Sequence, residues 1–347
     1  QPTIGTLPDD ALNEAIQVLN DNAARLIGLD FYRDFPATAE LTQTFQQADN
    51  VVTVCLFGDT ETPGVYAATE VAPEQVSFSN FVSDRPGGAT YVRRHYLMDA
   101  PDPDYCSINT AFSLTLAQRF LEPEGITFQS PETPEGIYSG NGMQIGAVTV
   151  PNLRPARGIY YRDGDELNGY QTLVNFRTTP NADTGKAKDA TAFAPQVSLE
   201  ALLTGAVPSE LIRDRIELIG YVSYADRTAA SCEKPHGTMP GVFVQGQMTS
   251  QLISATLDGR SLIHWWPFGQ EALWILGWGL AGGFMARQTS RFRMLALGIG
   301  VGTGMLYVCC WGAMVFATLW IPFIPAFGAF ALTAGGVALI GDRLRKP

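Results

Sequence analysis

Three apolar runs near the C-terminal end constrain the fold of this chain most. They extend from Trp265 to Met285, from Met294 to Phe316 and from Leu319 to Ile340. A helix needs about 20 apolar residues to cross the hydrocarbon core of a bilayer, and it pairs its own backbone groups there. The sequence therefore predicts three transmembrane helices within residues 265–341 and a cytoplasmic tail at 342–347. Buried helices of a soluble protein are the alternative, which three adjacent runs disfavour.

Basic residues flank these runs and predict the direction of insertion. Six of them follow the first and third runs: Arg287, Arg291, Arg293, Arg343, Arg345 and Lys346. Basic residues in short loops stay on the cytoplasmic side, and with three crossings both groups share one face. Residues 1–264 are thus expected on the periplasmic or lumenal side, as an extracytoplasmic domain. Trp265, Trp266, Trp320 and Phe323 are expected in an aromatic belt at the outer interface.

The charge of the outer part excludes one class of partner. Six of the 23 basic residues and two of the 34 acidic residues lie from residue 265 onward, so the rest of the chain has a net charge of −15. So acidic a domain is a poor partner for nucleic acid or for a flat contact with anionic lipid. The lipid bilayer is the partner expected for the apolar runs.

Helices and strands alternate through the outer part. A helix at Pro8–Asn22 and a strand at Arg25–Tyr32 precede a short helix at Leu41–Ala48 and a nearly continuous apolar strand at Val51–Phe57. This order is typical of a βαβ unit in a parallel sheet. Residues 58–89 are rich in Pro, Gly and Asp and are predicted to be mostly loop. The expected class is α/β, with a mainly parallel or mixed central sheet flanked by helices.

Later segments extend this pattern toward the first apolar run. Ser107 is expected to cap a helix at Ile108–Leu121, and Arg215–Val222 is expected to form a strand. A helix at Phe243–Leu257 is predicted to lead into the membrane segment.

Three cysteines lie outside the apolar runs. Cys55 ends a predicted strand and Cys106 precedes a predicted helix, so both are expected near one edge of the sheet. A disulfide between them is predicted, with Cys232 free; three buried thiols are the alternative. Such a bond requires Cα atoms within about 7 Å and persists in an oxidising compartment.

Charged residues follow two of the predicted strands. In open α/β sheets ligands bind beyond the carboxyl ends of the strands. Six residues of this kind are candidates for binding a ligand: Asp30, Arg33, Asp34, Asp226, Arg227 and His236. A salt-bridged or solvated loop is the alternative interpretation. Arg93 and Arg94 alternate faces on a predicted strand, so only one of them is expected to point at a site.

No catalytic residue, metal site or cofactor is predicted. His95, His236 and His264 lack metal-ligand spacing with cysteines or carboxylates. The segment Gly277–Gly282 matches a G-x-G-x-x-G pattern, but it lies inside an apolar run without a preceding strand. Close helix packing is the better interpretation. The glycines of the second run, among them Gly300 and Gly304, suggest packing within the bundle or a homodimer that meets through these helices.

Several short motifs together resemble the type-two CHASE sensor domain. They are Ile27–Pro36, Tyr91–Arg94, Leu173–Arg177, Ile216–Gly220, Pro240–Gln245 and Ser250–Ala255. The resemblance covers nearly the whole chain, including the apolar runs. It implies an extracytoplasmic sensor that passes a signal, in response to a ligand that the sequence does not identify, to a cytoplasmic effector.

The resemblance extends to cyanobacterial membrane proteins in which a caspase-like CHAT region precedes the sensor. Compared with the family, the chain lacks the first strand and the transmembrane helix before it, so an upstream segment is expected. Two other functions remain open, a docking subunit of a membrane complex and an extracytoplasmic enzyme. The enzyme is disfavoured because no nucleophile, base and orienting group can be assembled from the motifs.

Overall fold

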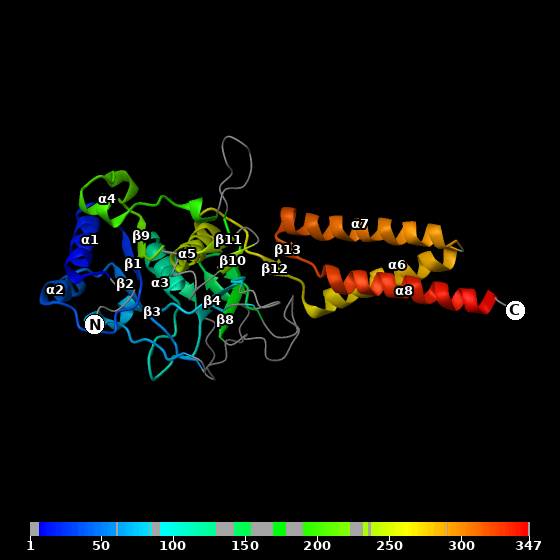
Figure 1. Cartoon of the computed structure of the whole chain (residues 1–347), viewed down its shortest axis with the longest axis horizontal. Coiled ribbons are helices and arrows are strands. Elements are labelled where there is room, and N and C mark those ends of the chain that lie inside the picture. The colour runs from blue at the N-terminus through cyan, green and yellow to red at the C-terminus, as the bar shows by residue number, and fades with distance from the viewer. Residues whose placement is uncertain are drawn as a thin grey trace. The chain divides into compact units, whose positions relative to one another are not determined.

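The structure is a computed structural model that describes residues 7–59, 62–82, 84, 91–129, 142–153, 169–177, 190–222, 232–234, 237–289 and 291–345. The chain divides into two compact units. Unit 1 comprises Gln1–Asn152 and Asn168–Arg260, and unit 2 comprises Leu153–Leu167 and Ser261–Pro347. Unit 1 holds the α/β domain, and unit 2 holds the apolar helices (Figure 1).

Unit 1 is built on a four-stranded sheet with the strand order β3-β2-β1-β9. The strands are β1 (Leu26–Asp30), β2 (Val51–Cys55), β3 (Val76–Phe78) and β9 (Ile216–Gly220). All three neighbouring pairs are parallel. Helix α2 (Ala39–Gln47) connects β1 to β2, so the predicted α/β class with a parallel sheet is confirmed.

Helices cover both faces of this sheet (Figure 1). On one face lie α1 (Asp9–Asp21), α2 and α4 (Leu199–Leu203), and against the other pack α3 (Phe112–Leu121) and α5 (Gly241–Leu257). Side chains of β1 alternate between the two cores, because successive residues of a strand point to opposite faces. Ile27 joins the core of α1 and α2, whereas Leu26 joins that of α3.

Gly28 lets α3 approach the sheet closely. A Cβ atom added there would lie 2.7 Å from Phe112 and 2.7 Å from Leu218. The glycine in the middle of the apolar strand β1 is therefore a packing requirement of this layer.

Smaller sheets and short helical turns complete unit 1. Strands β4 (Arg94–Met98) and β8 (Tyr170–Leu173) form an antiparallel pair. A three-stranded antiparallel sheet consists of β5 (Phe128–Gln129), β6 (Met143–Ile145) and β7 (Val148–Val150). A second antiparallel pair consists of β10 (Cys232–Lys234) and β11 (Gly237–Met239). The 3-10 turns are η1 (Pro73–Gln75), η3 (Glu122–Glu124), η4 (Ala190–Phe193) and η5 (Ser209–Leu211).

Two expectations for unit 1 need correction in detail. The segment expected to be mostly loop also contains β3, whose central Ser77 is fully buried and lies 2.7 Å from the hydroxyl of Thr115. Helix α3 begins at Phe112, with Ala111 and not Ser107 as its N-cap. The helix starts later because the backbone before it pairs with strands: Phe78 N donates to the Thr110 carbonyl, and Ala111 N donates to a carbonyl of β4.

Unit 2 contains three long helices that pack together. They are α6 (Phe268–Gln288), α7 (Phe292–Ala317) and α8 (Phe323–Arg345); short strands β12 (His264–Trp265) and β13 (Leu319–Trp320) pair in parallel. Helices α6 and α8 are in close contact, and the Thr333 hydroxyl donates across it to the Gly279 carbonyl at 2.7 Å. At Gly282 an added Cβ atom would clash with the Phe330 carbonyl. The predicted close packing at these glycines is confirmed.

Two helices of the described chain are long and apolar enough to cross a membrane, Phe292–Ala317 and Phe323–Ile340. Two of the three predicted helices fall in this class, whereas α6 does not. Glycines recur along α6 and contribute little apolar surface, and Gln270 and Glu271 add polar groups to its first turn. Helix α7 nevertheless exposes many large apolar side chains, among them Leu297, Val301, Met305 and Val308.

Candidate functional site

The carboxyl ends of the parallel strands form one edge of the sheet in unit 1. Strands β1 and β9 are neighbours and pair along the whole of β1, so the two charged segments predicted to meet do follow adjacent strands. Asp30 is partly buried at the end of β1, and Asp34 is exposed. Asp226, Arg227 and His236 lie outside the described residues, and their place at this edge stays a prediction.

Arg33 is already engaged within the fold. Its side chain is 3% exposed, and one guanidinium nitrogen lies 2.8 Å from an Asp9 carboxylate oxygen at the start of α1. The guanidinium also stacks over the Phe35 ring at 4.4 Å. The other Asp9 oxygen accepts a hydrogen bond from Thr38 N, the N-cap of α2. Arg33 and Asp9 therefore tie the loop after β1 to the N-termini of two helices.

A polar network that the sequence did not reveal lies at the same edge. Tyr32, which is 38% exposed, places its hydroxyl 2.9 Å from that of Ser79, the residue after β3. Ser79 N donates to the Cys55 carbonyl at 3.0 Å. The buried Gln245 of α5 donates to the Ser79 carbonyl at 3.2 Å. The ends of β1, β2 and β3 are thus connected to α5 through Ser79.

A disulfide joins Cys55 at the end of β2 to Cys106 in the loop before α3. The two Cα atoms are 5.6 Å apart, and both side chains are buried. This is the pair that the sequence favoured. The side chain of Cys232 lies outside what the structure describes.

Arg93 and Arg94 both contact one carboxylate, that of Asp84, at 2.8 and 2.9 Å. Their side chains differ in exposure, at 49% for Arg93, which precedes β4, and 3% for Arg94. Arg94 is buried and also donates to Gln171 at 3.0 Å, so it is a structural residue of the β4–β8 pair.

Two glutamines of α5 pair with the backbone at the end of β8 and in the segment that follows it. Gln247 accepts from Arg177 N at 2.8 Å and donates to Arg177 O at 2.7 Å. One turn later, Gln251 accepts from Asn175 N at 2.5 Å and donates to the Leu173 carbonyl at 3.1 Å. Each side-chain amide thus satisfies backbone groups as a neighbouring strand would.

These glutamines fix α5 to the segment that contains the Leu173–Arg177 motif. Arg260, just after α5, also donates to the Asn175 carbonyl at 2.6 Å. The signal that could have found this contact is the pair of amides four residues apart in a predicted helix, since such residues share one face.

Two groups of unit 1 have strongly shifted pKa values. Burial lowers the pKa of His95 to about 3, and its Nε2 lies 2.7 Å from the Ser113 hydroxyl. Both side chains are buried, so this serine–histidine pair lies within the core and not at a surface where a substrate could enter. Burial also raises the pKa of Glu217, on β9, to about 7, against the opposing effect of Arg215.

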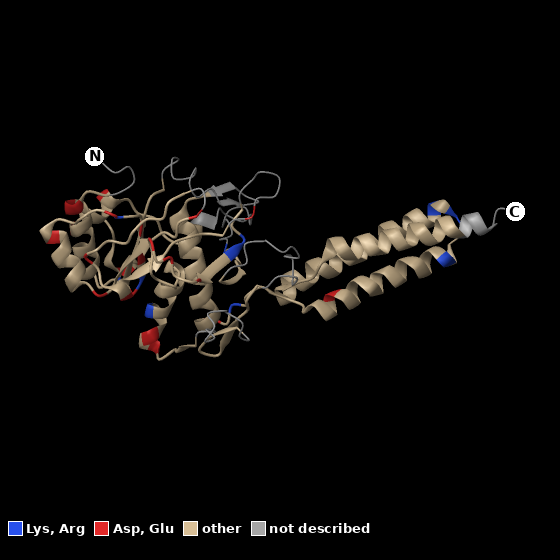
Figure 2. Cartoon of the chain, turned by 90° about the horizontal axis from the view of Figure 1, so that it is seen from below, with Lys and Arg blue, Asp and Glu red and all other residues tan. Residues whose placement is uncertain are grey.

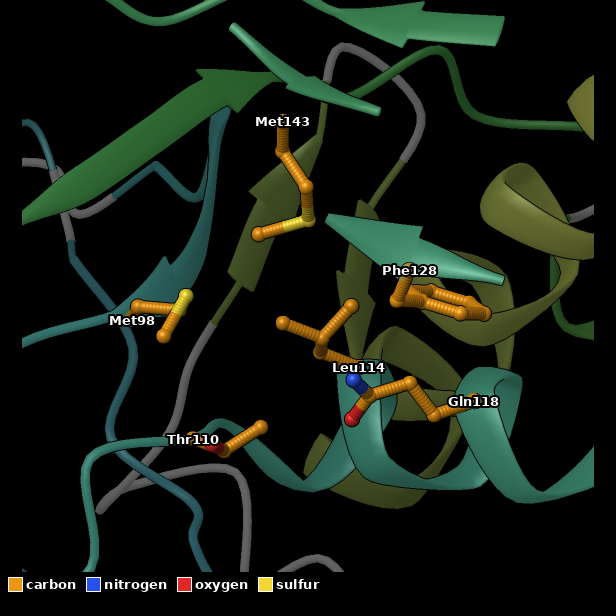
Figure 3. Close-up of a pocket in the computed structure, with 6 residues that line it drawn as sticks. All are labelled: Met98, Thr110, Leu114, Gln118, Phe128 and Met143. Atoms are coloured by element: carbon orange, nitrogen blue, oxygen red, sulfur yellow. The ribbon is translucent and has the colours of Figure 1, made fainter. Parts of the chain in front are cut away.

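A small cavity lies between α3, β4 and the β5–β6 hairpin (Figure 3). Its volume is about 70 Å³, and it is lined by Met98, Thr110, Leu114, Gln118, Phe128 and Met143. Typical small-molecule pockets measure about 300–1,000 Å³, so this cavity is too small for a drug-sized ligand.

Among the residues that the structure describes, no group of three or more His, Cys, Asp or Glu side chains is placed to hold a metal ion. No curated protein and no solved structure matches the chain. The family model of the CHASE2 domain matches residues 3–284, most of the chain including nearly all of α6. The chain therefore belongs to the CHASE2 family of extracellular sensor domains.

Proposed function

We propose that this protein is a membrane-anchored sensor whose outer domain changes shape on binding a ligand and transmits that change to a cytoplasmic effector. The main support for this proposal is that one chain combines a CHASE2 domain with a unit of exposed apolar helices. Large exposed apolar patches mark interaction or membrane surfaces.

Helix α6 is proposed as a third crossing despite its lower apolar content. Its exposed face carries Leu273, Leu276, Leu280 and Phe284, whose exposed fractions range from 57% to 70%. At 21 residues, it is long enough to span about 30 Å of hydrocarbon. With three crossings, the outer domain and the C-terminus lie on opposite sides of the membrane.

Two further observations support the orientation. Arg287 near the end of α6, and Arg291 and Arg293 before and within the start of α7, gather at one end of the helices (Figure 2). Trp265 and Trp320 pair at the opposite ends of α6 and α7, through β12 and β13. Basic cytoplasmic loops and an outer aromatic belt are typical of this arrangement. The buried disulfide suits an oxidising, extracytoplasmic compartment.

Helix α5 is the proposed path from the sensing edge to the membrane. Gln245 contacts Ser79 at the edge where Asp30, Asp34, Asp226, Arg227 and His236 are proposed to meet the ligand. Its later residues hold β8, and only residues 258–267 separate it from α6. A ligand shifts such a system only as far as it binds one conformation better than the other. A ligand that moves Ser79 would therefore move α5.

The effector and the oligomeric state complete the proposal. The effector is proposed to be a cytoplasmic domain of the same full-length protein, as in the CHAT-containing proteins that the sequence motifs resemble. A homodimer is proposed to meet through the outward face of α7, where Gly300 and Gly304 have no neighbour within 4 Å.

Reporter fusions test the topology. A reporter fused after Pro347 should be active only in the cytoplasm, and one inserted within residues 183–188 only outside. If α6 does not cross, both reporters will report the same side, and the three-helix anchor is wrong. The reverse orientation of both reporters would overturn the sensor reading itself.

A further inference from the structure

A groove of about 1110 Å³ runs along unit 2 between α6 and α8. The bottom of the groove is formed where Gly279 and Gly283 of α6 lie beside Ala329 and Val337 of α8. Apolar side chains of α6 wall it, among them Leu276, Leu280 and Phe284, and each of these is more than half exposed. The groove is thus a long apolar channel that opens on the surface proposed to face lipid.

A buried glutamate lines one end of this groove and an exposed arginine lines the other. Glu271, in the first turn of α6, lines one end, and Arg287, in the last turn, lines the other. Sixteen positions of helix separate them, or about 24 Å at 1.5 Å per residue. Arg291 and Arg293 follow Arg287 in the chain and are exposed. The groove therefore has one basic end, on the side proposed to be cytoplasmic.

An apolar groove of this kind could bind either a helix or a lipid, and the basic residue at its end helps to distinguish the two. A helix of a second copy would be α7, the most exposed apolar helix, but α7 contains no Asp or Glu to pair with Arg287. An anionic phospholipid supplies both parts, an acyl chain for the apolar walls and a phosphate for the basic end. Basic pockets at the cytoplasmic ends of transmembrane helices bind such headgroups. The inverted placement would bring the phosphate to the Glu271 end, away from Arg287, the basic residue of the lining.

We propose that the α6–α8 groove binds an anionic phospholipid of the cytoplasmic leaflet, with its phosphate at Arg287 and an acyl chain along Leu280 and Leu276. The inference rests on the proposed crossing of α6 and names a ligand for that bundle. Because the lipid would contact both α6 and α8, it would favour the packing of these helices in which the groove is open.

The test uses the full chain in phosphatidylcholine bilayers that contain a phosphatidylglycerol with a photoreactive group on its acyl chain. Crosslinks mapped by mass spectrometry should fall on the groove residues of α6 and α8. Gly283→Leu should block the groove, since a Cβ atom there has only Val337 as a neighbour, at 3.7 Å. Gly277→Leu is the matched control, because Gly277 also lies on α6, has no neighbour within 4 Å and does not line the groove.

Arg287→Gln should reduce the labelling by about fivefold, the loss expected for one basic residue beside an anionic lipid surface. Arg287→Lys should retain most of it. Labelling spread evenly over α7 as well, or unchanged in Gly283→Leu, would overturn the lipid site. Crosslinks from groove residues to a second copy of the chain would instead show a helix as the occupant and would also overturn it.

A separate measurement distinguishes this failure from failure of the proposed topology. In intact membranes, Ala272→Cys and Leu280→Cys should resist a membrane-impermeant maleimide. If Leu280→Cys is modified, α6 does not lie in lipid, and the crossing and the lipid site are both wrong. If it is protected while the lipid labelling is unspecific, only the lipid site is wrong.

Discussion

Helices α5 and α7 reverse the usual relation between polarity and burial. Helix α5 carries glutamine, serine and threonine, yet it is buried on nearly every side. Helix α7 is almost wholly apolar, yet its large side chains are mostly exposed. A buried polar group is stable only with a hydrogen-bond partner, and α5 has such partners in β8 and Ser79. An exposed apolar helix is stable when its solvent is lipid. Unit 1 therefore buries a polar helix, whereas unit 2 exposes apolar helices that are compatible with a membrane.

The largest expected contrast concerns the cysteines of the two units. The disulfide of unit 1 spans 51 positions, and loss of such a crosslink is expected to cost about 4 kcal/mol of unfolding free energy. Cys55→Ser combined with Cys106→Ser should therefore strongly destabilise unit 1. In unit 2, Cys309 is an exposed free thiol on α7, and Cys309→Ser should change stability by less than about 0.5 kcal/mol.

Hydrogen exchange of the full chain, measured in a mild detergent at increasing denaturant concentrations, gives the unfolding free energy of each unit. All six tryptophans lie from Trp265 onward, so their fluorescence reports unit 2 separately. Equal losses of unfolding free energy in the Cys55→Ser/Cys106→Ser variant and in the Cys309→Ser variant would contradict this prediction.

The second contrast is in pH dependence. Folded unit 1 keeps His95 neutral, with a pKa of about 3, whereas the unfolded chain binds a proton near pH 6.5. The stability of unit 1 should therefore fall as the pH drops from 6.5 toward 3, by about 1.4 kcal/mol per pH unit. At pH 4 this amounts to about 3 kcal/mol. Glu217 acts in the opposite direction, since its raised pKa makes stability fall as the pH rises from 4.5 toward 7.

Comparison with a variant isolates the histidine contribution. His95→Asn should flatten the acid limb of a stability–pH curve, although it also lowers stability at neutral pH. His264→Asn is the control, because His264 is exposed in unit 2. A wild-type acid limb that persists unchanged in His95→Asn would show that another group causes it.

Much of this organisation was predictable because it depends on local pattern. Apolar runs and turn residues located β1, β2, β9, α1 and α5 to within a few residues, and the order of elements predicted the parallel sheet. Strand β3 was missed since its centre, Ser77, is polar, and its burial depends on Thr115, which is 38 positions away.

The candidate site was harder to predict for the same reason. Sequence order placed charged residues after β1 and β9, which are indeed adjacent. It could not show that Arg33 is neutralised by Asp9, or that Gln245 reaches Ser79, because both contacts join segments distant in the chain. Pairings of this kind are fixed by tertiary packing and not by local propensity.

The smallest expected effect distinguishes two groups of glycines in unit 2, those of α6 that face α8 and those of α7 that face outward. Gly282 of α6 faces the Phe330 backbone of α8, and the Trp278 and Phe330 rings meet edge to face with their centroids 5.6 Å apart. Gly282→Leu should therefore separate these helices and shift the tryptophan emission. Gly300→Leu should leave the emission unchanged, because nothing lies within 4 Å of that position.

Gly300→Leu should instead act between protomers. Small residues let transmembrane helices approach closely, and a leucine at this position is expected to weaken the proposed dimer by about tenfold, or about 1.4 kcal/mol. Crosslinking in native membranes measures this, with the Gly304→Leu variant as a second probe of the same face. If both variants crosslink as well as the unaltered chain while Gly282→Leu disturbs the bundle, the outward glycines of α7 do not form the dimer contact. If only monomers are found even in the unaltered chain, signalling must pass through a single bundle, and α5 would have to act on α6 alone.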